Sequence, residues 1–131
     1  MLAMEDTNLK QQKLETDFAT VEIDAEGIIH VEGKEGADVT KKDFELLDSW
    51  LAKFNLEKRI ICADRSKSYS HTFDAQKMLM NRKNITALAM YVTSPVKLEL
   101  AEMAKDVYLR NFPVQVFTDK KEAMKWLRTF L

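Results

Sequence analysis

The chain has 131 residues, a length that fits one domain, and 46% of them are hydrophobic, enough to form a buried core. Its 20 basic and 21 acidic residues give a net charge of −1, so no basic excess is present to neutralise phosphates and no nucleic-acid partner is expected. No apolar run approaches the ~18 residues of a membrane span, and the polar stretch 4–17 is unlike a signal peptide.

Cysteine and histidine are scarce. Cys62 is the single cysteine and lies inside an apolar run, so no intrachain disulfide can form and a reducing, cytoplasmic location is expected. His30 and His71 have no second ligand at metal spacing. The glycine-rich loops that hold nucleotide phosphates are also absent. We therefore expect neither a metal nor a cofactor.

The chain begins with a polar segment and continues into an alternating one. Residues 1–17 carry scattered leucines and are expected to form a flexible N-terminal arm or a short helix, ahead of one domain over 18–131. From Phe18 to Gly33, apolar and polar residues alternate on both sides of a turn at Gly27, which predicts a β-hairpin. The alternation places His30 on the solvent side of its strand.

The rest of the sequence predicts helices in alternation with short strands. Thr40 followed by Asp43 is a capping box, Ser94–Pro95 is a strong helix start, and Thr118 is expected to cap the last helix. The apolar runs between helices do not alternate, as is typical of strands buried on both faces. The predicted helices cover 38–55, 73–85, 95–111 and the segment after 118, and the predicted strands cover 58–64, 86–94 and 114–117.

An opening hairpin followed by alternating helices and strands indicates an α/β fold. Such an order favours a mostly parallel sheet with right-handed crossovers and helices packed against it. We expect a sheet of about five strands and about four helices.

Polar residues follow each predicted buried strand, at the edge where open parallel sheets bind ligands. The first strand ends in Asp64, the second in Thr93–Ser94 and the third in Thr118–Asp119–Lys120. Together with the polar loop after the first strand, they define a candidate binding or switch surface. Its members are Asp64, Arg65, Ser66, Ser68, Ser70, His71, Thr72, Thr93 and Ser94.

Other interpretations of these strand ends remain. Asp64, Thr93 and Lys120 or Lys121 mimic the set found in phosphorylatable receiver domains. Those domains also need an acidic pair after the first strand to hold Mg²⁺, and here that strand turns straight back into a hairpin, with Asp24 and Glu26 in the turn. Alternatively, the hydroxyls only cap helices and satisfy loop amides. No nucleophile stands beside a base and an orienting group, so we expect no enzyme.

Four segments resemble the SpoIIAA-like branch of the STAS superfamily, small bacterial proteins related in fold to anti-sigma-factor antagonists. They are "VEIDAEGIIHVEG", "RIICADRSKSYSHTFDAQKML", "ALAMYVTSPVKLELAEMAK" and "FPVQVFTDKKEAMKWL". The close of the chain, with Phe117, Ala123 and Trp126–Leu127, carries the resemblance most clearly. The resemblance implies a SpoIIAA-like fold and a regulatory role.

Anti-sigma-factor antagonists carry a phosphorylated serine in an Asp-Ser-Ser-Gly-like motif, at the start of the helix after the central strand. The resemblance implies a switch at the matching position of this chain. The matching residues here are His71–Ala75, and they lack that motif. Thr72 can cap this helix and can accept a phosphate, as can Ser70 and Ser68 earlier in the loop.

Two functional hypotheses follow. The first is a non-catalytic regulatory or interaction domain that binds a partner protein through residues 65–75, and it predicts an exposed loop with an apolar patch. The second is a module that binds a small apolar or lipid-like ligand near the strand ends or under the second and third helices. It predicts an enclosed cavity of roughly a few hundred Å³, which Met78, Met80, Met90 and Met103 would suit. A free hairpin edge also makes a homodimer possible.

Overall fold

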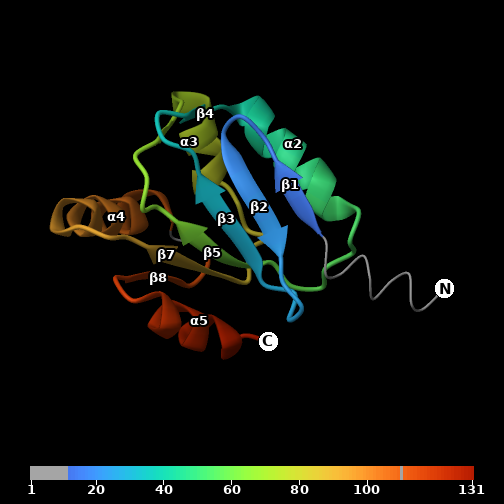
Figure 1. The fold of residues 1–131 in the computed structure, drawn as a ribbon. Coiled ribbons are helices and arrows are strands. Elements are labelled where there is room, and N and C mark those ends of the chain that lie inside the picture. The colour runs from blue at the N-terminus through green and yellow to red at the C-terminus, as the bar shows by residue number, and fades with distance from the viewer. Residues whose placement is uncertain (1–11, 110) are drawn as a thin grey trace.

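The computed structural model describes residues 12–109 and 111–131, and Figure 1 shows their arrangement. In chain order the elements are β1 (Lys13–Glu15), β2 (Ala19–Ile23), β3 (Ile29–Gly33), β4 (Asp38–Val39), α2 (Lys41–Ala52), β5 (Ile60–Asp64), β6 (Ser70–His71), α3 (Phe73–Met80), β7 (Ala87–Tyr91), α4 (Pro95–Tyr108), β8 (Val114–Phe117) and α5 (Lys120–Arg128).

One sheet of six strands forms the centre, in the order β1-β2-β3-β5-β7-β8. The hairpin pairings β1–β2 and β2–β3 are antiparallel, whereas β3–β5, β5–β7 and β7–β8 are parallel. The predicted α/β fold with an opening hairpin and a mostly parallel sheet is therefore confirmed. A second, two-residue parallel ladder joins β4 to β6 and was not predicted.

The first strand corrects the prediction for the N-terminal arm. Lys13 and Glu15 pair with Glu22 and Thr20 on β2, and the Leu14 side chain between them packs against the core. Three residues are too few to show a strand period in the sequence, so this segment resembled a loose arm. The hairpin edge that was expected to be free is thus covered by β1, and the outer strands of the sheet are β1 and β8. Residues 1–11 of the predicted arm lie outside the described residues.

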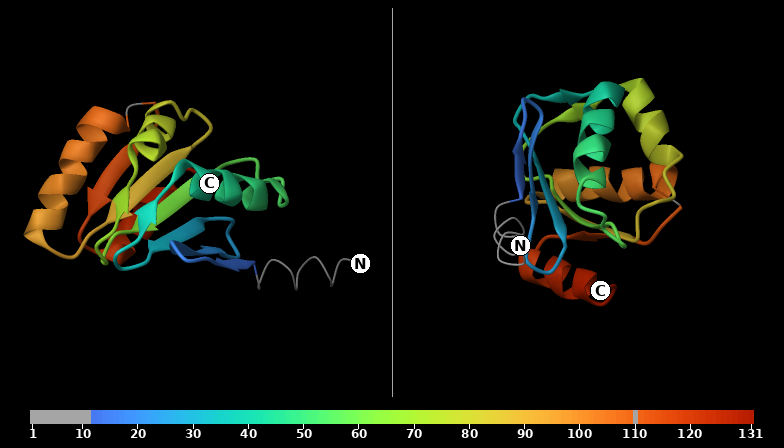
Figure 2. Two further views of the ribbon diagram at one scale, coloured as in Figure 1. Left: turned by 90° about the horizontal axis from the view of Figure 1, so that it is seen from above. Right: turned by 90° about the vertical axis from the view of Figure 1, so that its right-hand side faces the viewer.

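Helices cover the two faces of the sheet unequally. Helices α2, α3 and α4 lie on one face and α5 lies on the other (Figures 1 and 2). The α5 helix contacts β5, β7 and β8 but leaves β2 and β3 uncovered. Within the described ranges, no helix is long and apolar enough to cross a membrane.

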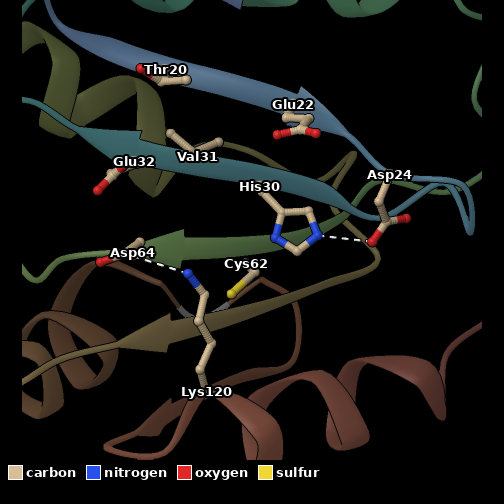
Figure 3. Close-up of a pocket in the computed structure, with 9 residues that line it drawn as sticks. All are labelled: Thr20, Glu22, Asp24, His30, Val31, Glu32, Cys62, Asp64 and Lys120. Carbon is tan, nitrogen blue, oxygen red and sulfur yellow. Dashed lines mark hydrogen bonds and ion pairs between the residues drawn. The ribbon is translucent and has the colours of Figure 1, made fainter. Parts of the chain in front are cut away.

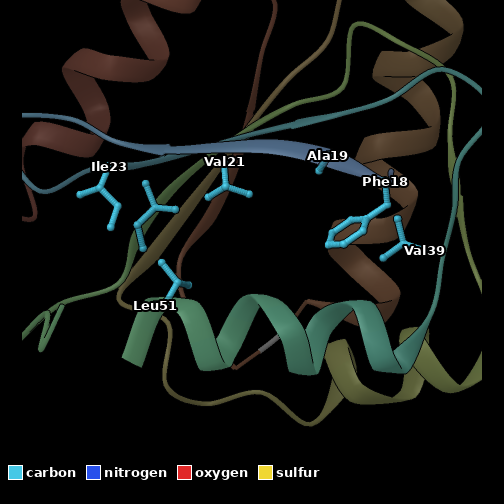
Figure 4. Close-up of a cluster of buried hydrophobic side chains, with 7 residues drawn as sticks. Phe18, Ala19, Val21, Ile23, Val39 and Leu51 are labelled. Carbon is cyan, nitrogen blue, oxygen red and sulfur yellow. The ribbon is translucent and has the colours of Figure 1, made fainter. Parts of the chain in front are cut away.

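Strand alternation explains where the core lies. Val21 and Ile23 on β2 are buried against Leu51 of α2, as Figure 4 shows. On the opposite face of the parallel strands, Cys62 packs against Leu127 of α5. The hairpin strands therefore have one apolar and one polar face, while the central strands are buried on both.

Local capping signals were mostly predicted correctly. The Asp43 amide donates to Thr40 Oγ1 at 3.2 Å, and the Thr40 amide donates back to the Asp43 carboxylate at 2.9 Å. Ser94 caps α4, as predicted. The cap of α5, however, is Asp119 and not Thr118. The carboxylate of Asp119 accepts the Lys121 amide at 2.9 Å and complements the helix dipole.

Three helices are shorter than predicted, and one of them, α4, ends at Tyr108 and not at residue 111. The segment that begins α2 in the sequence pattern, Asp38–Val39, is strand β4, and α2 starts only after Thr40. At the other end, α3 stops at Met80, because the side-chain amide of Asn81 donates to the Lys77 carbonyl at 3.1 Å and competes with continued helix.

Candidate functional site

The loop after the central strand β5 carries most of the predicted surface, but its side chains do not form one site. Adjacent residues at the end of a strand point to opposite faces of the sheet. The nine predicted residues therefore divide among three places: the face that carries α5, the space beneath α2 and α3, and the outer surface.

Asp64 turns towards α5. Its carboxylate accepts the Ser66 amide at 2.9 Å and the Lys120 ammonium at 3.1 Å. Burial acts to raise the pKa of Asp64, but the bonds from Ser66 and Lys120 outweigh it and hold the pKa below its usual value. The pair joins two of the predicted strand ends, and neither residue shares a site with Thr93.

Arg65 and His71 turn to the opposite face and join a stack of rings. The Arg65 guanidinium lies 4.8 Å from the centroid of the Tyr69 ring. The centroids of the Tyr69 and His71 rings are 5.6 Å apart. The His71 ring in turn stacks on Phe44 of α2, with 5.6 Å between the centroids, and the Arg82 guanidinium lies 5.4 Å from the Phe44 centroid. A cation therefore lies over each of the two outer rings of this three-ring stack.

The stack depends on β6 and on a glycine. In the two-residue ladder β4–β6, alternation directs Ser70 outward and His71 inward. The Tyr69 ring occupies the space beside Gly33 where a Cβ would stand, because an added Cβ would lie 2.2 Å from it. Gly33 is therefore needed for a close approach and not for a turn.

Burial shifts the pKa values of two groups in the stack, His71 and Tyr69. It lowers the pKa of His71 to about 4, with a smaller contribution from the Arg65 charge, so the imidazole is neutral at pH 7. Burial likewise raises the pKa of Tyr69. Both half-buried groups are kept uncharged and act as packing surfaces.

A cavity of about 120 Å³ lies behind this stack, between the sheet and helices α2 and α3. Most of its wall is apolar, with Ile61 and Met90 on the sheet side. At one end, the Asp48 carboxylate accepts Arg59 at 3.0 Å and Arg82 at 2.9 Å. Arg65 also lines the cavity, so the wall contains three guanidinium groups and one carboxylate.

Of the four methionines expected to suit a cavity, the structure places Met90 in this wall. Met80 and Met103 are 43% and 59% exposed on the surface, and Met78 lines a different, open groove between α2 and α3.

The hydroxyl residues lie on the outside and are largely occupied. Ser70 Oγ donates to Asp38 at 2.9 Å. Thr72 caps α3, accepts the Ala75 amide and donates to Asp74. A phosphate on Ser70 or Thr72 would meet a neighbouring carboxylate, so this geometry disfavours the phosphorylation switch of anti-sigma-factor antagonists.

The remaining predicted residues line or border a groove between the loop and α4. The Ser68 amide donates to Glu35 at 3.1 Å, and the Ser66 carbonyl accepts from Lys97. Thr93 is exposed, and Ser94 caps α4. The groove has a volume of about 180 Å³, and its wall is formed by Arg65, Lys67, Ser68, Tyr69, Val92, Lys97, Leu100 and Ala101.

An exposed apolar stripe on α4 continues this groove. Val96, Leu100 and Met103 are 67%, 59% and 59% exposed, and their spacing of four and three residues places them on one side of the helix. This stripe was not predicted from the sequence. Its only signal is that α4 carries more apolar residues than one buried face requires.

A second feature missed from the sequence is a polar cavity of about 300 Å³ on the α5 side of the hairpin (Figure 3). His30 does point away from the Val31 face, as predicted, but its Nε2 lies 2.8 Å from Asp24 Oδ2 instead of being free in solvent. Among the described residues, no three His, Cys, Asp or Glu side chains are placed to hold a metal ion.

Comparison with solved structures establishes the class of the protein as a SpoIIAA-like α/β fold. The chain is similar to the crystal structure of an uncharacterised protein of the DUF3478 family, described as having a SpoIIAA-like fold, from Shewanella loihica PV-4. The two share 16% sequence identity with a TM-score of 0.58, over 87% of this chain and 98% of the other.

The sequence also matches the family described as "Domain of unknown function (DUF7793)" over residues 21–131. The chain therefore belongs to the DUF7793 family. No curated protein matches the sequence.

Proposed function

We propose that this chain is a non-catalytic interaction domain that binds a regulatory protein partner through the loop 65–69 and the outer side of α4. The exposed stripe of Val96, Leu100 and Met103 is the observation that carries the proposal. Large apolar side chains gathered on one exposed helix face are typical of protein-binding surfaces.

The adjoining groove supports a partner of particular chemistry. Its wall contains Arg65, Lys67 and Lys97 and no carboxylate. A segment that presents apolar side chains to the stripe and acidic side chains to the groove would complement both features. Phosphorylation is not required for such binding, in keeping with the engaged hydroxyls of Ser70 and Thr72.

Site-specific photo-crosslinking tests this proposal. A benzophenone amino acid in place of Leu100 or Met103 should give a crosslink to one defined protein in the source cells, and the same group in place of Leu46 should not. Leu46 is a matched control because it is 50% exposed on a different helix, α2. The purified partner should then lose at least about tenfold in affinity for Leu100→Glu, since a buried unpaired charge costs more than 1.4 kcal/mol. Equal crosslinks from all three positions, or none, would contradict the proposal.

The cavity beneath α2 and α3 supports a second candidate, a small apolar ligand. At about 120 Å³ it is smaller than expected and suits a ligand of roughly the size of one aromatic ring. Native mass spectrometry of the purified chain should then show a retained small mass. The mass should be lost in Ala63→Leu, which fills the cavity from the sheet side. A spectrum of the bare chain in both proteins would argue against this candidate.

A further inference from the structure

The polar cavity beside α5 is built by strand alternation and register. On each hairpin strand, every second side chain points to the face opposite α2, and the pairing brings them into two rows across the sheet. The sticks in Figure 3 come from β2, β3 and β5, from the turn after β2 and from the start of α5. One row is Glu22, His30 and Cys62, and the other is Thr20, Glu32 and Asp64.

Negative charge exceeds positive charge in this wall. It contains four carboxylates, on Glu22, Asp24, Glu32 and Asp64, and one ammonium, on Lys120. Lys120 is engaged by Asp64 at 3.1 Å, and Lys67, from outside the wall, reaches Glu32 at 3.5 Å. Glu22 is the exception.

No ion pair or hydrogen bond to the Glu22 carboxylate occurs within the part of the chain that the structure describes. Lys13 lies opposite Glu22 in the β1–β2 register and offsets part of its charge, but its ammonium lies 3.9 Å from Glu15 and makes no direct ion pair with Glu22.

Hydrogen bonds within the wall leave acceptors facing the cavity. A neutral His30 ring places its proton on Nε2, which donates to Asp24 at 2.8 Å, so Nδ1 remains an acceptor. The Thr20 hydroxyl donates its proton to Glu15 at 2.8 Å, and its lone pairs stay available. Together with the Glu22 oxygens, these groups accept hydrogen bonds and offer none.

The floor of the cavity holds a buried thiol. Cys62 is 1% exposed and makes no hydrogen bond among the residues described, yet it lines the cavity next to His30 in the register. Figure 3 shows its sulfur beneath the His30 ring, on the side of Lys120. Burial raises the pKa of Cys62, so the group remains an uncharged thiol. The sulfur belongs to the core cluster that contains Leu127, so the floor of the cavity is apolar.

We propose that this cavity binds a small organic cation with a primary ammonium or guanidinium group, held by the Glu22 carboxylate and His30 Nδ1. Ammonium and guanidinium groups carry only donors, which matches a wall whose free groups are acceptors. A charge-assisted bond to Glu22 supplies the strongest contact. The volume of about 300 Å³ lies at the lower end of small-molecule sites. The cavity is on the opposite face of the sheet from α4, and Lys67, which lines the groove and reaches Glu32 at 3.5 Å, connects the two surfaces.

Calorimetric titration of the full chain with butane-1,4-diamine tests the proposal, with butane-1,4-diol as the uncharged probe of similar shape. One diamine should bind per chain and the diol should not. Glu22→Gln should weaken binding about tenfold or more, because a hydrogen bond between charged groups contributes about 1.5–3 kcal/mol. His30→Phe keeps a ring but removes the acceptor and should weaken it severalfold.

The control is Glu45→Gln, which removes an exposed carboxylate on α2 and should leave the affinity unchanged. Circular dichroism confirms that each variant is folded. An equal loss of affinity in Glu45→Gln would show diffuse attraction to an acidic surface and overturn the proposal. Binding of the diol, or no binding of the diamine to the unaltered protein, would overturn it as well.

Discussion

The two faces of the opening hairpin are made by the same strands and have opposite roles. On the α2 side, Val21 and Ile23 are fully covered. On the α5 side, Glu22 and His30 line a cavity that no described helix closes. The difference shows how side chains that alternate along a strand are used: one set is buried in the core and stabilises the domain, and the other set lines an open polar cavity.

Truncation of a core side chain should give the largest difference in unfolding free energy between the two faces. Ile23→Ala should reduce the free energy of unfolding by about 2–5 kcal/mol, because Ile23 is 1% exposed and its neighbours cannot close the space. Glu22→Ala, one residue away, should change it by less than about 0.5 kcal/mol. Urea denaturation of both variants measures the contrast, and similar losses from the two would show that the α5-side face is also structural.

The half-buried His71 makes the α2 side sensitive to acid. Its pKa is lowered to about 4 in the folded protein, against about 6.5 when unfolded, so the unfolded chain binds more protons between these values. Stability should be fully present above pH 6.5 and should fall as the pH drops towards 4, by at most about 3 kcal/mol. Unfolding free energies between pH 7 and 4.5 measure this slope. His71→Phe should flatten it, and an unchanged slope in that variant would assign the acid sensitivity to other groups.

A third test concerns the contact between the Tyr69 ring and Gly33 at the end of β3. Gly33→Ala should cost about 1–3 kcal/mol, because the new Cβ falls within 2.2 Å of the Tyr69 ring and the ring must move. Tyr69→Ser should relieve the clash, so the double variant should be more stable than the sum of the single losses predicts. Simple additivity in this double-mutant cycle would mean that the ring does not rest on Gly33.

Much of the fold was predictable because its signals are local. The capping box at Thr40 and Asp43 and the start of α4 at Ser94 depend on residues three or four positions apart. The order of helices and strands then indicates a parallel sheet. The strand β1 and the ladder β4–β6 were missed because two or three residues carry no measurable period.

The candidate site was predictable only as a set of residues in one loop. Sequence order suggested that Asp64, Arg65 and His71 would act together, but they lie on opposite faces of the sheet, and Asp64 pairs instead with Lys120, 56 positions away. The bond between His30 and Asp24 was also missed, although only six positions separate them. Such contacts depend on the conformation of a turn or on which helix covers which face.

The sequence by itself determined the element order, the α/β class and the alternation that divides each hairpin strand into an apolar and a polar face. These are properties of backbone hydrogen bonding and side-chain period, which short segments carry on their own. Only the tertiary structure decided that α5 stops short of β2 and β3, and that the outer side of α4 stays bare. A helix covers a face according to the length and direction of its crossover connection, and that is a property of the whole chain.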